Sequence, residues 1–164
     1  YEMLRSLVGS EMCIRDRISG LFSGKSYNLN SLTVGETEDT TVSRMTISFT
    51  SDDRTFEQVK KQLNRSVEVI KVVDYTDIPI HNKEILFIKV KECNTDDKDE
   101  VFRIANAFNF KITDYDRKNI LVECLQTENQ NNDAIKLFKQ SFPNRIEVVR
   151  GGSVAVEAIS MSER

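Results

Sequence analysis

The chain has 164 residues with 26 acidic and 23 basic side chains, and its formal charge of −3 argues against a protein that neutralises nucleic-acid phosphates. At roughly 100 to 200 residues per domain, this length fits one ordinary domain or two very small ones. No run approaches the roughly 18 apolar residues of a membrane span, because charged residues interrupt each one. We therefore expect a soluble globular protein that binds neither nucleic acid nor a membrane.

The cysteines indicate the redox compartment. Cys13, Cys93 and Cys124 are odd in number, widely spaced and without a C-x-x-C pair. A disulfide framework normally shows an even number of cysteines in a short secreted chain. The sequence therefore favours free thiols and a reducing compartment.

The first sixteen residues differ in character from the rest of the chain. Residues 6–16 show neither strand alternation nor a helical stripe, and they resemble translated sequencing-adapter DNA. The chain also begins with Tyr1 rather than Met. We expect residues 1–16 to be foreign to the natural protein; an irregular natural segment is the alternative.

The first half of the chain alternates between helical and strand periodicity. Apolar residues at helical spacing before Gly24 indicate the end of an amphipathic helix. Residues 27–34 and 43–49 alternate polar and apolar side chains and are predicted to pair as a hairpin. A helix capped near Asp52 and a β-branched strand over 67–73 follow. With one lost leading strand added, the order becomes βαββαβ.

The second half repeats this order after a connector that contains Pro79 and His81. Gly151 and Gly152 predict a turn between two short terminal strands. The copies share no obvious residue identity, so the repeat is one of topology. The predicted elements are a strand over 84–91, a helix over 97–108, a hairpin of 111–115 with 119–125, a helix over 132–142 and a strand over 146–149.

This order predicts an α+β protein with two small sheet units. Each unit should form a four-stranded antiparallel sheet with two helices on one face. A unit of roughly 75 residues buries a modest core, and an open edge strand favours pairing with another chain. We therefore expect a dimer.

Side chains suited to catalysis are sparse. His81 is the lone histidine and has no second ligand at metal spacing, so no metal site is expected. The sequence has no phosphate-binding glycine loop and no nucleophile elbow. The sequence therefore favours binding of a small molecule over catalysis. Helix capping and turns explain the acidic pairs better than acid–base chemistry does, and these pairs are Glu38-Asp39, Asp52-Asp53 and Asp96-Asp97.

Several long blocks of the chain resemble the regulatory small subunit of acetolactate synthase, also called acetohydroxyacid synthase. The resemblance implies tandem ferredoxin-like units, with an N-terminal ACT domain over 1–78, a linker over 79–83 and an ACT-like domain over 84–164. The blocks that carry it are residues 17–23, 27–35, 43–47, 57–64, 69–72, the His81 connector and residues 147–152.

The resemblance also implies a function without catalytic residues. Members activate the large catalytic subunit and confer feedback inhibition by valine or another branched-chain amino acid, which binds between two side-by-side ACT domains. No cofactor is expected on this chain, because thiamine diphosphate, Mg and FAD belong to the catalytic subunit. The implied location is the bacterial cytoplasm; an organelle stays open because the native amino terminus is missing. The alternative is a free-standing amino-acid-sensing ACT module that regulates another enzyme or a transcription factor.

Two residues carry the implied effector site. Asn28 matches the family's effector-binding asparagine, and its amide can both donate to and accept from a zwitterion; Leu29 follows where a backbone group contacts the ligand. The partner loop of the family reads Asn-x-x-Gly, but the aligned positions here are Ser10 and Cys13. Cys13 adds a Cβ where glycine allows close approach. We interpret this departure as an overwritten loop; lost feedback binding is the alternative.

Overall fold

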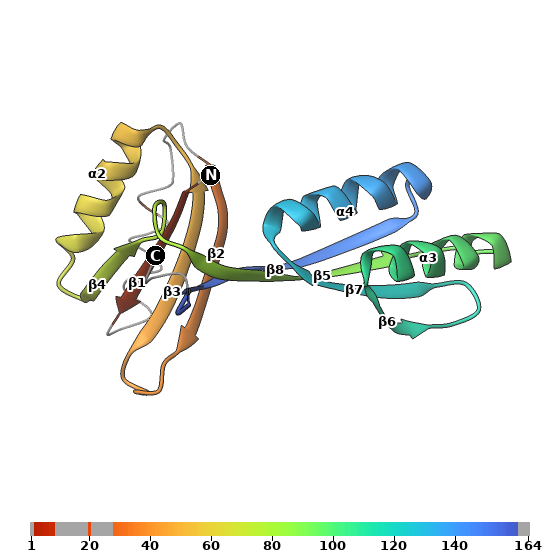
Figure 1. Ribbon diagram of the computed structural model, residues 1–164, viewed down its shortest axis with the longest axis horizontal. Coiled ribbons are helices and arrows are strands. Elements are labelled where there is room, and N and C mark those ends of the chain that lie inside the picture. Colours follow the sequence, from red (N-terminus) through yellow and green to blue (C-terminus); the bar gives the residue numbers. More distant parts are fainter. Residues whose placement is uncertain (1, 9–19, 21–27, 161–164) are drawn as a thin grey trace. The chain divides into compact units, whose positions relative to one another are not determined.

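The computed structural model describes residues 2–8, 20 and 28–160, and these fall into two compact units. The first unit comprises Tyr1–His81 with Ser153–Arg164, and the second comprises Asn82–Gly152. The two four-stranded sheets have the orders β2-β3-β1-β4 and β6-β7-β5-β8 (Figure 1). The expected α+β class with two βαββαβ-like units is confirmed.

A strand that the sequence analysis did not assign lies inside the first sheet. β1 (Glu2–Val8) runs between β3 (Ser43–Thr50) and β4 (Val69–Asp74) and is antiparallel to both. Pairing on both sides satisfies the backbone groups of β1, so tertiary contacts define this strand. The leading strand treated as lost is therefore present. Apart from Gly20, the helix predicted before Gly24 lies outside the described residues.

The predicted hairpin and helix of the first unit are confirmed. β2 (Asn28–Glu36) pairs antiparallel with β3. Helix α2 (Asp53–Asn64) begins after Asp52, whose carboxylate accepts the Thr55 N–H at 2.7 Å. One side of β3 packs against the apolar face of α2, and the Phe49 and Phe56 rings stack at 5.4 Å. The buried residues of this core are Met45, Ile47, Phe49, Phe56, Val59 and Leu63.

In the second unit the elements follow one another in the predicted order, but some of them begin earlier in the sequence than predicted. β5 (Ile80–Val90) begins four residues before the expected position, so exposed His81 lies in a strand. α4 (Glu128–Ser141) begins four residues early because Thr127 and Gln130 form a capping box. The remaining elements are α3 (Thr95–Phe108), β6 (Lys111–Tyr115), β7 (Ile120–Gln126) and β8 (Ile146–Glu157).

The predicted turn at the paired glycines is wrong, because β8 continues through them to Glu157. Gly152 has φ 82°, which a residue with a Cβ adopts at a cost. Gly151 lies against β5, where an added Cβ would stand 2.5 Å from Ile85 Cγ2. The glycines therefore permit a bend and a close strand approach within one strand.

Gly151→Ala should destabilise the protein by about 1–3 kcal/mol, because the new methyl overlaps Ile85 Cγ2. Ile85→Ala removes that carbon from a side chain that is 39% exposed, and in this background Gly151→Ala should cost much less. Gly35→Ala is the control, since a Cβ there meets nothing within 4 Å. Urea denaturation of the four variants and the wild type measures these differences; equal costs in both backgrounds would contradict the contact.

A second prediction concerns acid stability of the second unit. Arg145 Nη1 lies 2.8 Å from Asp97 Oδ2, and the Asp97 carboxylate also accepts the Asn94 N–H. The Arg145 hydrogen bond, followed by that of Asn94, lowers the pKa of the Asp97 carboxyl. A lowered folded-state pKa gives a stabilisation that is complete well above pH 4 and is lost as the pH falls through the folded-state value.

Asp97→Asn keeps an amide oxygen at the cap but removes the charge. The variant should therefore melt below the wild type at pH 7, and the difference should shrink as the pH falls below about 4. Thermal unfolding followed by circular dichroism between pH 2.5 and 7 measures it. A difference that stays constant over this range would exclude the ion pair as its cause.

Candidate functional site

The predicted effector residues lie at the first two positions of β2. The Cα atoms of Asn28 and Leu29 pair with those of Thr50 and Phe49, and the register shifts between Leu29 and Ser31. Leu29 is 39% exposed, which leaves an apolar side chain open to a ligand or another chain. The structure thus places these residues at the start of an edge strand; their role in effector binding stays a prediction.

The Asn28 side chain and the partner loop with Ser10 and Cys13 lie outside the described residues. Two residues after Asn28, the bulge residue Asn30 donates from Nδ2 to Thr50 Oγ1 at 3.0 Å. Bulges re-aim neighbouring side chains and often occur beside functional sites. The local backbone therefore has the irregularity expected where a strand end receives a ligand.

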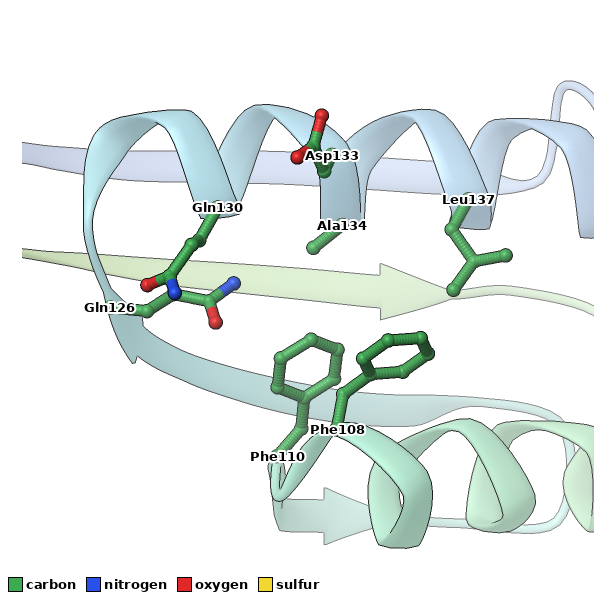
Figure 2. A pocket seen from close by; sticks show the side chains of 7 residues that line it. All are labelled: Phe108, Phe110, Gln126, Gln130, Asp133, Ala134 and Leu137. Carbon is green, nitrogen blue, oxygen red and sulfur yellow. The ribbon is translucent and has the colours of Figure 1, made fainter.

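A cavity of about 440 Å³ lies in the second unit between the end of α3 and the start of α4 (Figure 2). Its walls are mostly apolar, and the Phe108 and Phe110 rings stack at 5.8 Å. Gln126, Gln130 and Asp133 are its polar lining residues. No lining residue is cationic, so this cavity lacks the positive charge that best receives an amino-acid carboxylate.

A second cavity, of about 470 Å³, lies along β4 in the first unit and does contain charges of both signs. Its lining includes Lys60, Lys71 and Asp74. The Asp74 carboxylate already accepts the Thr76 N–H at 2.9 Å and the Thr76 hydroxyl at 2.6 Å, and it lies 3.5 Å from Lys60 Nζ. The acceptor capacity of Asp74 is largely used, but Glu157 also lines this cavity, so a second carboxylate lies there together with Lys71.

The acidic pairs serve structure, as predicted. The Asp52 carboxylate caps α2, and the hydrogen bonds from Thr55 lower its pKa. Asp39 accepts from the Thr41 N–H and hydroxyl inside a turn. Asp97 belongs to the capping box of α3. Each carboxylate is held ionised by local donors, which suits capping and disfavours proton transfer near neutral pH.

The described cysteines are free and buried, and neither has the features of a nucleophile. Burial raises the pKa of the Cys124 thiol to about 12 and also raises that of Cys93. Both thiols are therefore protonated at neutral pH. Cys13 lies outside the described residues.

No group of three or more His, Cys, Asp or Glu side chains in the described part of the chain could hold a metal ion. None of the described helices has the length and apolar content needed to cross a bilayer.

A polar network in the second unit was missed by the sequence analysis. Glu84 is 2% exposed, and its Oε1 accepts from Arg150 Nε at 2.8 Å and from Asn131 Nδ2 at 3.1 Å. Arg150 Nη1 also donates to Asn132 Oδ1 at 2.7 Å. The network ties β5 and β8 to the first turns of α4. One feature of the sequence did indicate this network: Glu84 occupies an inward-facing position in a strand whose side chains alternate between the two faces of the sheet.

Comparison with known proteins identifies the family of this chain. Residues 83–159 match the model of the small subunit of acetolactate synthase, and residues 14–71 match that of the AHAS small subunit-like ACT domain. The chain is 40% identical to the acetolactate synthase small subunit of Aquifex aeolicus over 91% of its length and 77% of that protein. It is 34% identical to the small subunit of Haemophilus influenzae, over 94% of this chain and 93% of that one.

The fold agrees with this relationship. The crystal structure of the acetolactate synthase small subunit from Thermotoga maritima superposes with a TM-score of 0.80 at 30% identity, covering 96% of this chain and 97% of that chain. The chain therefore belongs to the family of acetolactate synthase small subunits.

Proposed function

We propose that this chain is the non-catalytic regulatory subunit of acetolactate synthase. It binds the large catalytic subunit, raises its turnover, and makes it subject to inhibition by valine or another branched-chain amino acid. The chain works in the cytoplasm and carries no cofactor of its own. Membership of the small subunit family supports the partner and the regulatory role.

The observation that carries the effector part of the proposal is the open side of β2. Among the described strands, β2 pairs with β3 and ends the sheet on its other side. A nine-residue edge strand exposes backbone donors and acceptors that a second copy can satisfy. Two copies paired along β2 would bring Asn28 and Leu29 next to the partner's loop and complete a site for a zwitterion.

Inhibition then requires a coupling free energy between this site and the catalytic subunit. Such couplings are typically about 1 to 3 kcal/mol, which is roughly 5- to 150-fold in affinity. An effector that bridges two copies also stabilises the dimer by mass action. Valine should therefore shift the chain toward the dimer while it lowers turnover.

A mixing assay tests the proposal. The printed chain and the double variant Ser10→Asn, Cys13→Gly are each added to the cognate catalytic subunit, and acetolactate formation is measured with and without valine. Both chains should raise turnover, and the variant should be the more sensitive to valine because it restores the family's Asn-x-x-Gly loop. If neither chain changes turnover, the proposal fails. A pull-down that instead recovers another enzyme or a transcription factor would support the free-standing sensor.

Asn28→Ala in the restored-loop chain should weaken valine inhibition by roughly ten-fold or more, because a zwitterion loses a hydrogen bond to a charged group. Activation should persist, since the substitution leaves the rest of the sheet unchanged. Asn30→Ala, two residues along the same strand, is the matched control and should keep both properties. Dose–response curves for valine measure the effect, and equal weakening by both substitutions would assign it to the strand rather than to Asn28.

A further inference from the structure

The sheet of the first unit carries small hydroxyl side chains on the face away from α2. In β3, Thr46 and Ser48 are 3% and 0% exposed, although they point opposite to the apolar core of this unit. Their register partners in β2 are Thr33 and Ser31. A sheet face is buried only where another part of the protein lies on it.

Residues 153–158, which we term the closing segment, lie against this face. Ser153 is 0% exposed; its carbonyl accepts from Thr33 Oγ1 at 2.9 Å, and its N–H donates to Ser31 Oγ at 3.4 Å. Further along, Ala155 packs with Tyr75 and Val73 at β4. The closing segment therefore contacts both edge strands of the sheet, and its contact with β2 is made by hydrogen bonds.

The closing segment continues a strand that is anchored in the second unit. Three residues before Ser153, Arg150 is bound to the buried Glu84 carboxylate and to Asn132. The tether between Arg150 and Ser153 is short, because three residues of extended chain span at most about 11 Å. Gly151 is further confined by its close approach to Ile85. Ser153 is therefore joined to the Arg150 anchor through two glycines, of which Gly152 has φ 82°.

We propose that the two hydrogen bonds that join Ser153 to Ser31 and Thr33 relay the state of the effector strand β2 to the second unit through the closing segment. This inference rests on the proposed function, because Asn28 and Leu29 open the same strand. An effector bound there fixes the first residues of β2 just before the bulge at Asn30. Ser31 is the next paired residue, and the closing segment bonds to it directly. Ser31 and Thr33 are positioning residues in this relay; they need not touch the effector.

The test compares two threonines that face the same way. Thr33→Val replaces the donating hydroxyl by a methyl and keeps the shape of the side chain. Thr46→Val is the matched control, because Thr46 is the register partner of Thr33 and its hydroxyl bonds to none of the described residues. Thr33→Ser restores the hydroxyl and serves as the rescue variant.

The first measurement is hydrogen–deuterium exchange of the full chain without effector. Thr33→Val should speed exchange in β2 and, across the tether, at residues 148–152, by roughly 2- to 10-fold for one lost hydrogen bond. Thr46→Val should leave residues 148–152 unchanged, and Thr33→Ser should restore wild-type exchange there. Exchange that changes in β2 alone would show that the closing segment merely covers the sheet, and the relay would be refuted.

The second measurement uses the holoenzyme with the restored-loop chain. Thr33→Val should raise the valine concentration for half-maximal inhibition by roughly 2- to 10-fold, while valine binding measured by calorimetry and activation both stay near wild type. A loss of inhibition that matches the loss of binding would contradict a relay. If the restored-loop chain itself neither binds valine nor is inhibited, the proposed function fails, and the exchange experiment still decides the link between β2 and the second unit.

Discussion

The need to cover both faces of a small sheet governs the first unit. Helix α2 covers one face of the sheet and packs against Met45, Ile47 and Phe49 of β3. Thr46 and Ser48, on the opposite face of β3, are nevertheless buried as well. Residues 153–158, the end of β8 and its continuation, lie on this opposite face, where Ser153 is hydrogen-bonded to Ser31 and Thr33. The outer face of the second sheet differs, since Ile85 and its register partner Leu125 remain 39% and 62% exposed. One strand thus serves two units, and this division explains why β8 is so long.

Local signals predicted the elements that depend on local chemistry. The alternation of 43–49 and the cap at Asp52 were sufficient for β3 and α2, because strand faces and helix termini are decided by nearby residues. β1 and the end of β8 depend instead on partners far away in the sequence, and Gly151 and Gly152 resemble turn residues unless the facing Ile85 is known. The early start of α4 did have a signal, in the Thr127 and Gln130 capping box.

The effector site was less predictable than the fold. Asn28 before a strand would be read as a turn residue from its own surroundings, and its assignment came from resemblance to the family alone. A physical reason lies in the edge position of β2: in the dimer proposed above, half of the groups of the site belong to another chain. The cavities of about 440 and 470 Å³ lie elsewhere, and the first of them has no cationic lining residue. The spacing of residues within one chain does not show which groups a second chain would supply.

The buried ion pair of Glu84 and Arg150 contributes to the register of β8. Burying a carboxylate that is 2% exposed costs desolvation energy, which the Arg150 and Asn131 hydrogen bonds offset, so net stability alone is a weak reason to keep the pair. Register is a stronger reason. Arg150 faces α4 and Gly151 meets Ile85, so a one-residue slip of β8 would place a side chain where no Cβ fits and turn the guanidinium away from its partner. The pair therefore helps to fix the register of β8 beside β5 within the second unit.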